Sequence, residues 1–119
     1  MRRRVALATL VALAAFGSCT ATARAPRSIG VAEREFHITP YATRFKRGPV
    51  KFNISNFGQD THNVVVKGPK GYRANGPDVK PGERGSFTAS LKRPGTYYLL
   101  CTRANHYKLG MRAKLTVKR

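Results

Sequence analysis

One stretch of the chain carries most of its chemical information: Cys101-Thr102-Arg103-Ala104-Asn105-His106-Tyr107-Lys108-Leu109-Gly110-Met111. It spaces a thiol, an imidazole and a thioether in the pattern C-x4-H-x4-M. Core-type residues alternate with other residues along residues 96–101 and 111–118, which predicts a strand on each side of the stretch. The stretch is therefore expected to be a hairpin loop that brings Cys101 close to Met111 and bends His106 back toward them.

Short alternating segments, separated by turn residues, run through the rest of the chain. With 11 Gly and 7 Pro in 119 residues, the composition suits one turn-rich β domain. Strands are predicted at residues 31–39, 50–54, 62–67 and 86–91. Residues 41–47 are expected to form a connection, and the Gly- and Pro-rich residues 68–83 a long loop. Together these segments predict an all-β, Greek-key β-sandwich of about six to eight strands.

Strand alternation also places the chemically active side chains. In the strand that begins at His62, residues 62, 64 and 66 are expected to face the core. Cys101 and Met111 fall on core-facing positions at the ends of their own strands. One thiolate, two imidazoles and one thioether form the donor set of a type 1 (blue) copper site, in which His2Cys is near-trigonal and the axial Met is weak. Such a site also gives a reason for the lone cysteine of the domain.

The same residues resemble the copper-binding segments of the cupredoxins, the small blue copper proteins similar to plastocyanin and azurin. The loop from Cys101 to Met111 is similar to theirs, residues 94–98 resemble the approach to the Cys ligand, and residues 56–58 with 61–64 resemble the segment of the first His ligand. The resemblance spans roughly residues 36–117. It implies that His62, Cys101 and His106 are the strong copper ligands and Met111 the weak axial one.

The resemblance also implies a supporting contact and a function. Asn63 is expected to bind Thr102 and so tie the ligand segments together. Many relatives have Pro-Gly where this chain has Ala104-Asn105. The function implied is that of an electron carrier that cycles between Cu(I) and Cu(II). An extracytoplasmic copper-handling protein without electron transfer would use the same ligands, and it remains the alternative.

An enzyme is not expected. The residues beside Cys101 are Leu100 and Thr102, so the His-Cys-His bridge of multicopper oxidases is missing. The chain has no room for a second catalytic copper domain, and the loop offers no second Cys for a binuclear centre. A cupredoxin-like adhesion domain without metal is disfavoured by the four intact ligands.

The charge of the chain is strongly positive, with 23 Lys and Arg against 5 Asp and Glu, a net charge of +18. The basic residues are spread along the chain, without a compact tract or a nucleic-acid motif, so no nucleic-acid partner is expected. A redox partner protein with an acidic docking surface is expected instead, or an anionic membrane surface. The protein is expected to be a monomer.

The resemblance further implies where such a partner would dock. In cupredoxins the loop histidine, here His106, usually reaches the surface within an apolar patch through which electrons pass. Arg103, Lys108 and Arg112 are therefore the candidate docking residues around this histidine.

The N-terminus has the pattern of an export signal. Three arginines precede an apolar run and then small residues, so residues 1–18 are predicted to be a signal peptide. Cys19 closes a segment that resembles a bacterial lipobox and is the candidate lipidation site, whereas cleavage at Ala21-Thr22-Ala23 would extend the signal to about residue 23. Residues 19–29 are predicted to be a tether and residues 30–119 the cupredoxin-like domain. The protein is expected outside the cytoplasm, in the periplasm or on its membrane.

Overall fold

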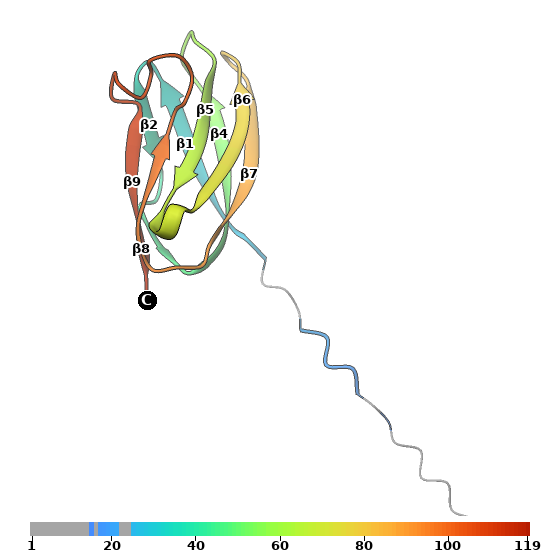
Figure 1. Cartoon of the computed structure of the whole chain (residues 1–119). Helices are drawn as coiled ribbons and strands as arrows, with labels where there is room; N and C mark the ends of the chain where they lie inside the picture. The colour runs from blue at the N-terminus through green and yellow to red at the C-terminus, as the bar shows by residue number, and fades with distance from the viewer. Residues whose placement is uncertain (1–14, 16, 22–24) are drawn as a thin grey trace, which may run out of the picture.

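Two β-sheets packed face to face make up the folded domain (Figure 1). The computed structural model describes residues 15, 17–21 and 25–119. Within these residues there are nine strands and one short 3-10 turn. The strands are β1 (Arg27–Arg34), β2 (His37–Pro40), β3 (Arg44–Lys46), β4 (Gly48–Asn56), β5 (His62–Lys67), β6 (Arg73–Val79), β7 (Arg84–Leu91), β8 (Gly95–Leu100) and β9 (Arg112–Lys118), and the 3-10 turn is η1 (Pro69–Gly71).

The strand order shows how the chain passes between the layers. One sheet has the order β2-β1-β4-β7 and the other β3-β9-β8-β5-β6. Strands β8 and β9 are antiparallel neighbours, with Leu100 opposite Arg112 in register, so the loop between them lies at one end of the sandwich. The all-β sandwich predicted from the sequence is confirmed.

The structure has more strands than the six to eight predicted. The expected first strand, residues 31–39, is interrupted at Glu35 and Phe36, and its two halves are antiparallel partners, β1 and β2. The expected connection at residues 41–47 contains β3, which buries only Phe45. The expected long loop contains β6. This strand lies at a sheet edge, where Pro77 is tolerated because its missing N–H is not needed for pairing.

The boundary of the domain also differs from the expected residue 30. Strand β1 begins at Arg27, which pairs with Val50 in a parallel ladder to β4, so the end of the predicted tether belongs to a sheet. The predicted signal peptide, residues 1–18, lies almost entirely outside the described residues, and its alternative end at residue 23 lies outside them too. Among the residues that are described, no helix is long and apolar enough to cross a membrane.

The core lies between the two sheets and follows the alternation of the sequence. Phe52, Leu91, Tyr97, Leu99 and Leu115 are fully or almost fully buried, and each removes a large apolar surface from water. At the loop end of the sandwich the buried residues become polar, and they include His62, His106, Asn56, Asn63 and Glu33. This change from apolar to polar burial marks the candidate site.

Candidate metal centre

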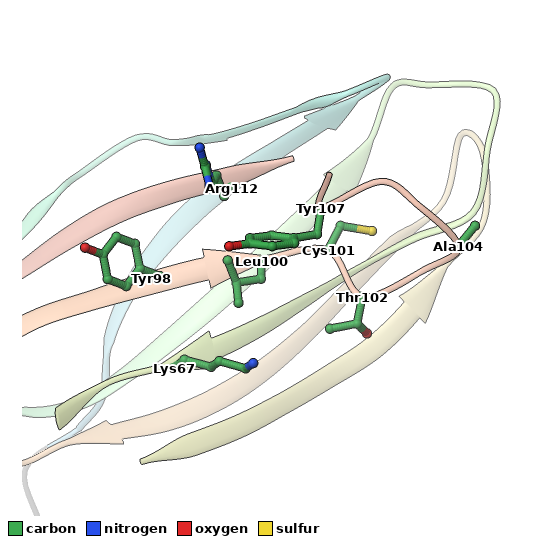
Figure 2. Close-up of a pocket in the computed structure, with 8 residues that line it drawn as sticks. All are labelled: Lys67, Tyr98, Leu100, Cys101, Thr102, Ala104, Tyr107 and Arg112. Carbon is green, nitrogen blue, oxygen red and sulfur yellow. The ribbon is translucent and has the colours of Figure 1, made fainter. Parts of the chain in front are cut away.

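Strand ends and the loop between β8 and β9 supply the predicted ligands. His62 is the first residue of β5. Cys101 directly follows Leu100 at the end of β8 (Figure 2). His106 and Met111 belong to the loop that joins β8 to β9. Two backbone hydrogen bonds close this loop: the Cys101 N–H donates to the Met111 carbonyl at 3.1 Å, and the Met111 N–H to the His106 carbonyl at 3.0 Å. The loop therefore holds its three candidate ligands together by its own backbone.

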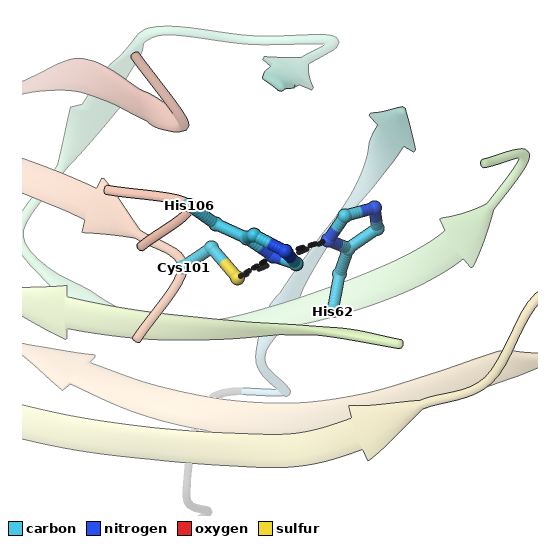
Figure 3. Close-up of side chains that lie close together, drawn as sticks. All are labelled: His62, Cys101 and His106. Atoms are coloured by element: carbon cyan, nitrogen blue, oxygen red, sulfur yellow. Dashed lines mark hydrogen bonds between the residues drawn. The ribbon is translucent and has the colours of Figure 1, made fainter. Parts of the chain in front are cut away.

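The side chains of His62, Cys101 and His106 converge on one point (Figure 3). The two Nδ1 atoms of the histidines lie 3.1 Å apart, and Cys101 Sγ lies 3.9 Å from Nδ1 of His62 and 3.5 Å from Nδ1 of His106. The centre of this triangle is about 2 Å from each atom, close to the usual metal–nitrogen distance of about 2.0 Å and metal–sulfur distance of about 2.3 Å. The triangle therefore has the size of a trigonal metal site.

Two carboxylates face the far side of the imidazoles. Nε2 of His62 lies 3.0 Å from Glu35 Oε1, and Nε2 of His106 lies 3.5 Å from Asp60 Oδ2. An ionised carboxylate only accepts hydrogen bonds, so Nε2 of His62 must carry the proton. The unprotonated Nδ1 then directs its lone pair at the centre of the triangle. This is the arrangement by which an outer carboxylate fixes the tautomer and orientation of a metal-binding histidine.

Glu35, in the turn between β1 and β2, is a site residue that no sequence pattern indicated. Its Oε1 accepts backbone hydrogen bonds from Gln59 at 2.7 Å and Asp60 at 2.8 Å in addition to the one from His62. The backbone hydrogen bond from Asp60 is the largest influence that lowers the pKa of Glu35 to about 2. Gly58 makes room for this carboxylate, because a Cβ at that position would collide with it.

The Cys101 thiol is completely buried, and burial raises its pKa. Backbone N–H groups of Asn63 and Arg103 act in the opposite direction, because each donates a hydrogen bond that favours the thiolate. Asn63 also joins the two ligand segments: its Nδ2 donates to Thr102 Oγ1 at 2.9 Å, and the Thr102 N–H donates to its Oδ1 at 2.8 Å. These are the two residues that the sequence singled out as supports of the site.

Two further predicted residues lie at opposite ends of the chain and in opposite environments. Met111, the expected axial ligand, is fully buried at the end of the loop and belongs to the core cluster. Cys19, the candidate lipidation site, is exposed, and neither it nor Cys101 forms a disulfide.

The three expected docking residues are all on the surface. Arg103 pairs with Asp78 at 3.2 Å, and Lys108 is exposed on the loop. The guanidinium of Arg112 lies over the ring of Tyr107, 5.6 Å from its centroid. Arg112 and Tyr107 therefore form a cation–π pair beside the loop.

His106 is mostly buried but lines a surface hollow. It is 8% exposed, with the ring of Phe36 packed against it at 5.3 Å between centroids and Asp60 at its outer nitrogen. Of the three expected docking residues, Arg103 lines a surface hollow together with His106, and Arg112 lines a separate groove beside Cys101.

Solved structures with the same architecture are known. The chain matches auracyanin from Roseiflexus castenholzii with a TM-score of 0.63 and 22% identity, over 81% of this chain and 100% of that one. It matches auracyanin A, a "blue" copper protein from Chloroflexus aurantiacus, with a TM-score of 0.63 and 22% identity over 79% and 100% of the two chains. The chain has the cupredoxin fold. An oxidised mutant of amicyanin matches it with 27% identity and a TM-score of 0.52, over 76% and 81% of the two chains.

No protein-family model and no curated protein sequence matches the chain. The cupredoxin fold and the converging donors of His62, Cys101 and His106, with buried Met111 beside them, fit one type 1 copper ion.

Proposed function

We propose that this protein is a small exported electron carrier, in which His62, Cys101 and His106 would hold one type 1 copper as strong ligands and Met111 would be the weak fourth ligand. The observation that carries the proposal is the triangle of two Nδ1 atoms and one thiol sulfur, with sides of 3.1, 3.5 and 3.9 Å, buried from solvent. Copper, when bound, supplies a one-electron couple between Cu(I) and Cu(II).

The chain's own residues supply rigidity around that couple. Asn63 and Thr102 tie the end of β8 to β5, and Glu35 fixes the ring of His62. Burial of Cys101 keeps water from its sulfur. A donor set that is held in place by such outer contacts changes little between two oxidation states, which favours rapid electron transfer.

An extracytoplasmic copper-handling role is the second candidate, because it would use the same donors. The closed loop and the outer carboxylates favour electron transfer over copper release, since both hold the ligands in position when no partner is present. Export of the protein and lipidation of Cys19 belong to the same proposal. The copper would then work outside the cytoplasm, with a redox partner that carries an acidic surface.

The absorption spectrum of the copper-loaded protein tests the metal site. We expect an intense thiolate-to-Cu(II) band at about 600 nm. Cys101→Ser should abolish it, whereas the matched variant Cys19→Ser should keep it, because Cys19 lies outside the folded domain. A band that survives Cys101→Ser overturns the ligand assignment.

Voltammetry of the same copper-loaded protein separates the two candidate functions. A reversible one-electron wave supports the electron carrier. Loss of copper on reduction supports the copper-handling alternative.

A further inference from the structure

The outer face of the five-stranded sheet is strongly basic. Strand alternation turns seven exposed Lys and Arg side chains of β3, β5, β6 and β9 outward from the core: Arg44, Lys46, Lys67, Arg73, Arg112, Lys114 and Lys118. Among the described residues of these strands the one acidic side chain is Asp78, at the loop end of β6, and it is paired with Arg103. We call this surface the basic face.

A groove of about 820 Å³ opens at the loop end of the basic face. Figure 2 shows Lys67, Tyr98, Tyr107 and Arg112 among the residues that line it, together with Cys101. Tyr98 is 46% exposed and Tyr107 45% exposed, so both rings offer apolar surface to a partner. None of the described residues that line the groove is acidic.

The register of the sheet places a lysine on each side of the Tyr98 ring. Tyr98 lies opposite Lys67 of β5 on one side and opposite Lys114 of β9 on the other. Tyrosine and arginine at the centre of a surface, with further charges around them, are the composition of protein docking sites.

We propose that an acidic partner protein docks on the basic face and places a carboxylate-bearing segment in the groove beside Cys101. The inference rests on the proposed electron-transfer function, and it assigns the docking surface within it. Charge complementarity selects a partner rich in Asp and Glu. The partner then approaches the metal site from the side of the cysteine ligand, because Cys101 lines the groove, whereas Asp60 places a carboxylate at the outer nitrogen of His106 and would repel an acidic segment there.

The opposite face of the sandwich provides the contrast. The outward residues of the four-stranded sheet are mostly Ser, Thr, Asn and Gly, with Arg34, Lys51 and Arg84 as its basic side chains.

The shape of the groove on the basic face distinguishes between two kinds of partner. A concave, tyrosine-lined groove accepts a protruding peptide segment, whereas a flat lipid surface would leave it empty. The shape therefore favours a protein over an anionic membrane.

Titration of the isotope-labelled full chain, without added metal, with a short oligoglutamate peptide at low ionic strength tests the inference by NMR. We expect the amide shifts to concentrate at Lys67, Tyr98, Leu100 and Lys114, which lie along the groove and the ladders beside it.

Two double variants, each with the same change in net charge, make the test specific to one face. Lys67→Glu/Lys114→Glu should weaken the affinity for the peptide about tenfold or more. The matched control, Lys51→Glu/Arg84→Glu, changes the opposite face and should have a clearly smaller effect.

Three results would overturn the inference. Equal losses in the two double variants would mean that only net charge attracts the peptide. Shifts centred on Asp60, Thr61 and Ala104 would place docking above His106 instead. Binding of phosphatidylglycerol vesicles through the basic face, without binding of the peptide, would identify a membrane surface. Because the titration needs no copper, its outcome is independent of the Cys101→Ser spectrum.

Discussion

Two glutamates at the end of β1, only two residues apart, have opposite environments. Glu35 lies in the turn, where its carboxylate accepts hydrogen bonds from Gln59, Asp60 and His62, and its pKa falls to about 2. Glu33 points into the core, fully buried, and both of its carboxyl oxygens lack a hydrogen-bond partner among the described residues. Burial raises the pKa of Glu33 to about 7.

The difference between the two shows that hydrogen-bond donors, more than residue type, decide how a carboxyl group acts near this site. Donors make Glu35 a permanent acceptor that can orient His62. Glu33 has no such donors and resists ionisation, because a buried carboxylate loses its hydration and no hydrogen bond replaces it. Substitutions of Glu33 and Glu35 test this contrast, and a third substitution, at Thr102, tests the neighbouring contact between the two ligand segments.

Removal of Glu33 should have the largest effect. Glu33→Met replaces the carboxyl group with an apolar side chain of similar length. At pH 8 the shift of the Glu33 pKa from 4.5 to about 7 corresponds to a cost of about 3 kcal/mol in the folded protein. We expect the variant to raise the free energy of unfolding of the metal-free protein by about that amount in urea denaturation.

The sign of the pH dependence provides a control for this prediction. The pKa of Glu33 is higher in the folded than in the unfolded state. Between about pH 4.5 and pH 7 the folded protein therefore binds more protons than the unfolded protein. The Glu33 contribution to stability is therefore complete below about pH 4.5 and is lost as the pH rises to about 7. Glu33→Met should remove this fall, and an unchanged pH profile in the variant would contradict the assigned environment.

Glu35→Gln tests the second glutamate, the one that contacts His62. The amide keeps the shape of the side chain but removes the charge that favours the Nε2–H tautomer of His62. We expect copper affinity to fall about tenfold, as measured by competition with a chelator, a typical cost of losing an outer hydrogen bond to a ligand. Asp60→Asn removes a longer contact, 3.5 Å from His106, and should cost less. Equal affinity in Glu35→Gln and the unmodified protein would contradict the orienting role.

Thr102→Ala should have the smallest effect. It removes the hydroxyl that accepts from Asn63 but keeps the backbone N–H that donates to the same side chain. We expect a loss of about 1 kcal/mol in the free energy of unfolding. A double-mutant cycle with Asn63→Ala should show coupling between the two positions, and additive losses would mean that the pair does not link the two ligand segments.

Much of the fold could be predicted from alternation alone. The inward positions of β4, β7, β8 and β9 are those at which apolar residues alternate, because a strand places successive side chains on opposite faces. Strand β6 was missed because it contains Gly and Pro. It forms because its backbone pairs with β5 in an antiparallel ladder. The break at Glu35 and Phe36 was missed because alternation continues through it.

The residue types and spacing of the donors were set by the sequence itself: His62, Cys101, His106 and Met111, with Asn63 beside the first, can be read from the chain in order. Only the tertiary structure decided what surrounds them. Glu35 reaches His62 across 27 positions of sequence, Phe36 covers His106, and seven basic side chains share one sheet face. Spacing within one segment constrains neighbours along the chain, whereas contacts between segments depend on sheet order and register, which local sequence patterns do not encode.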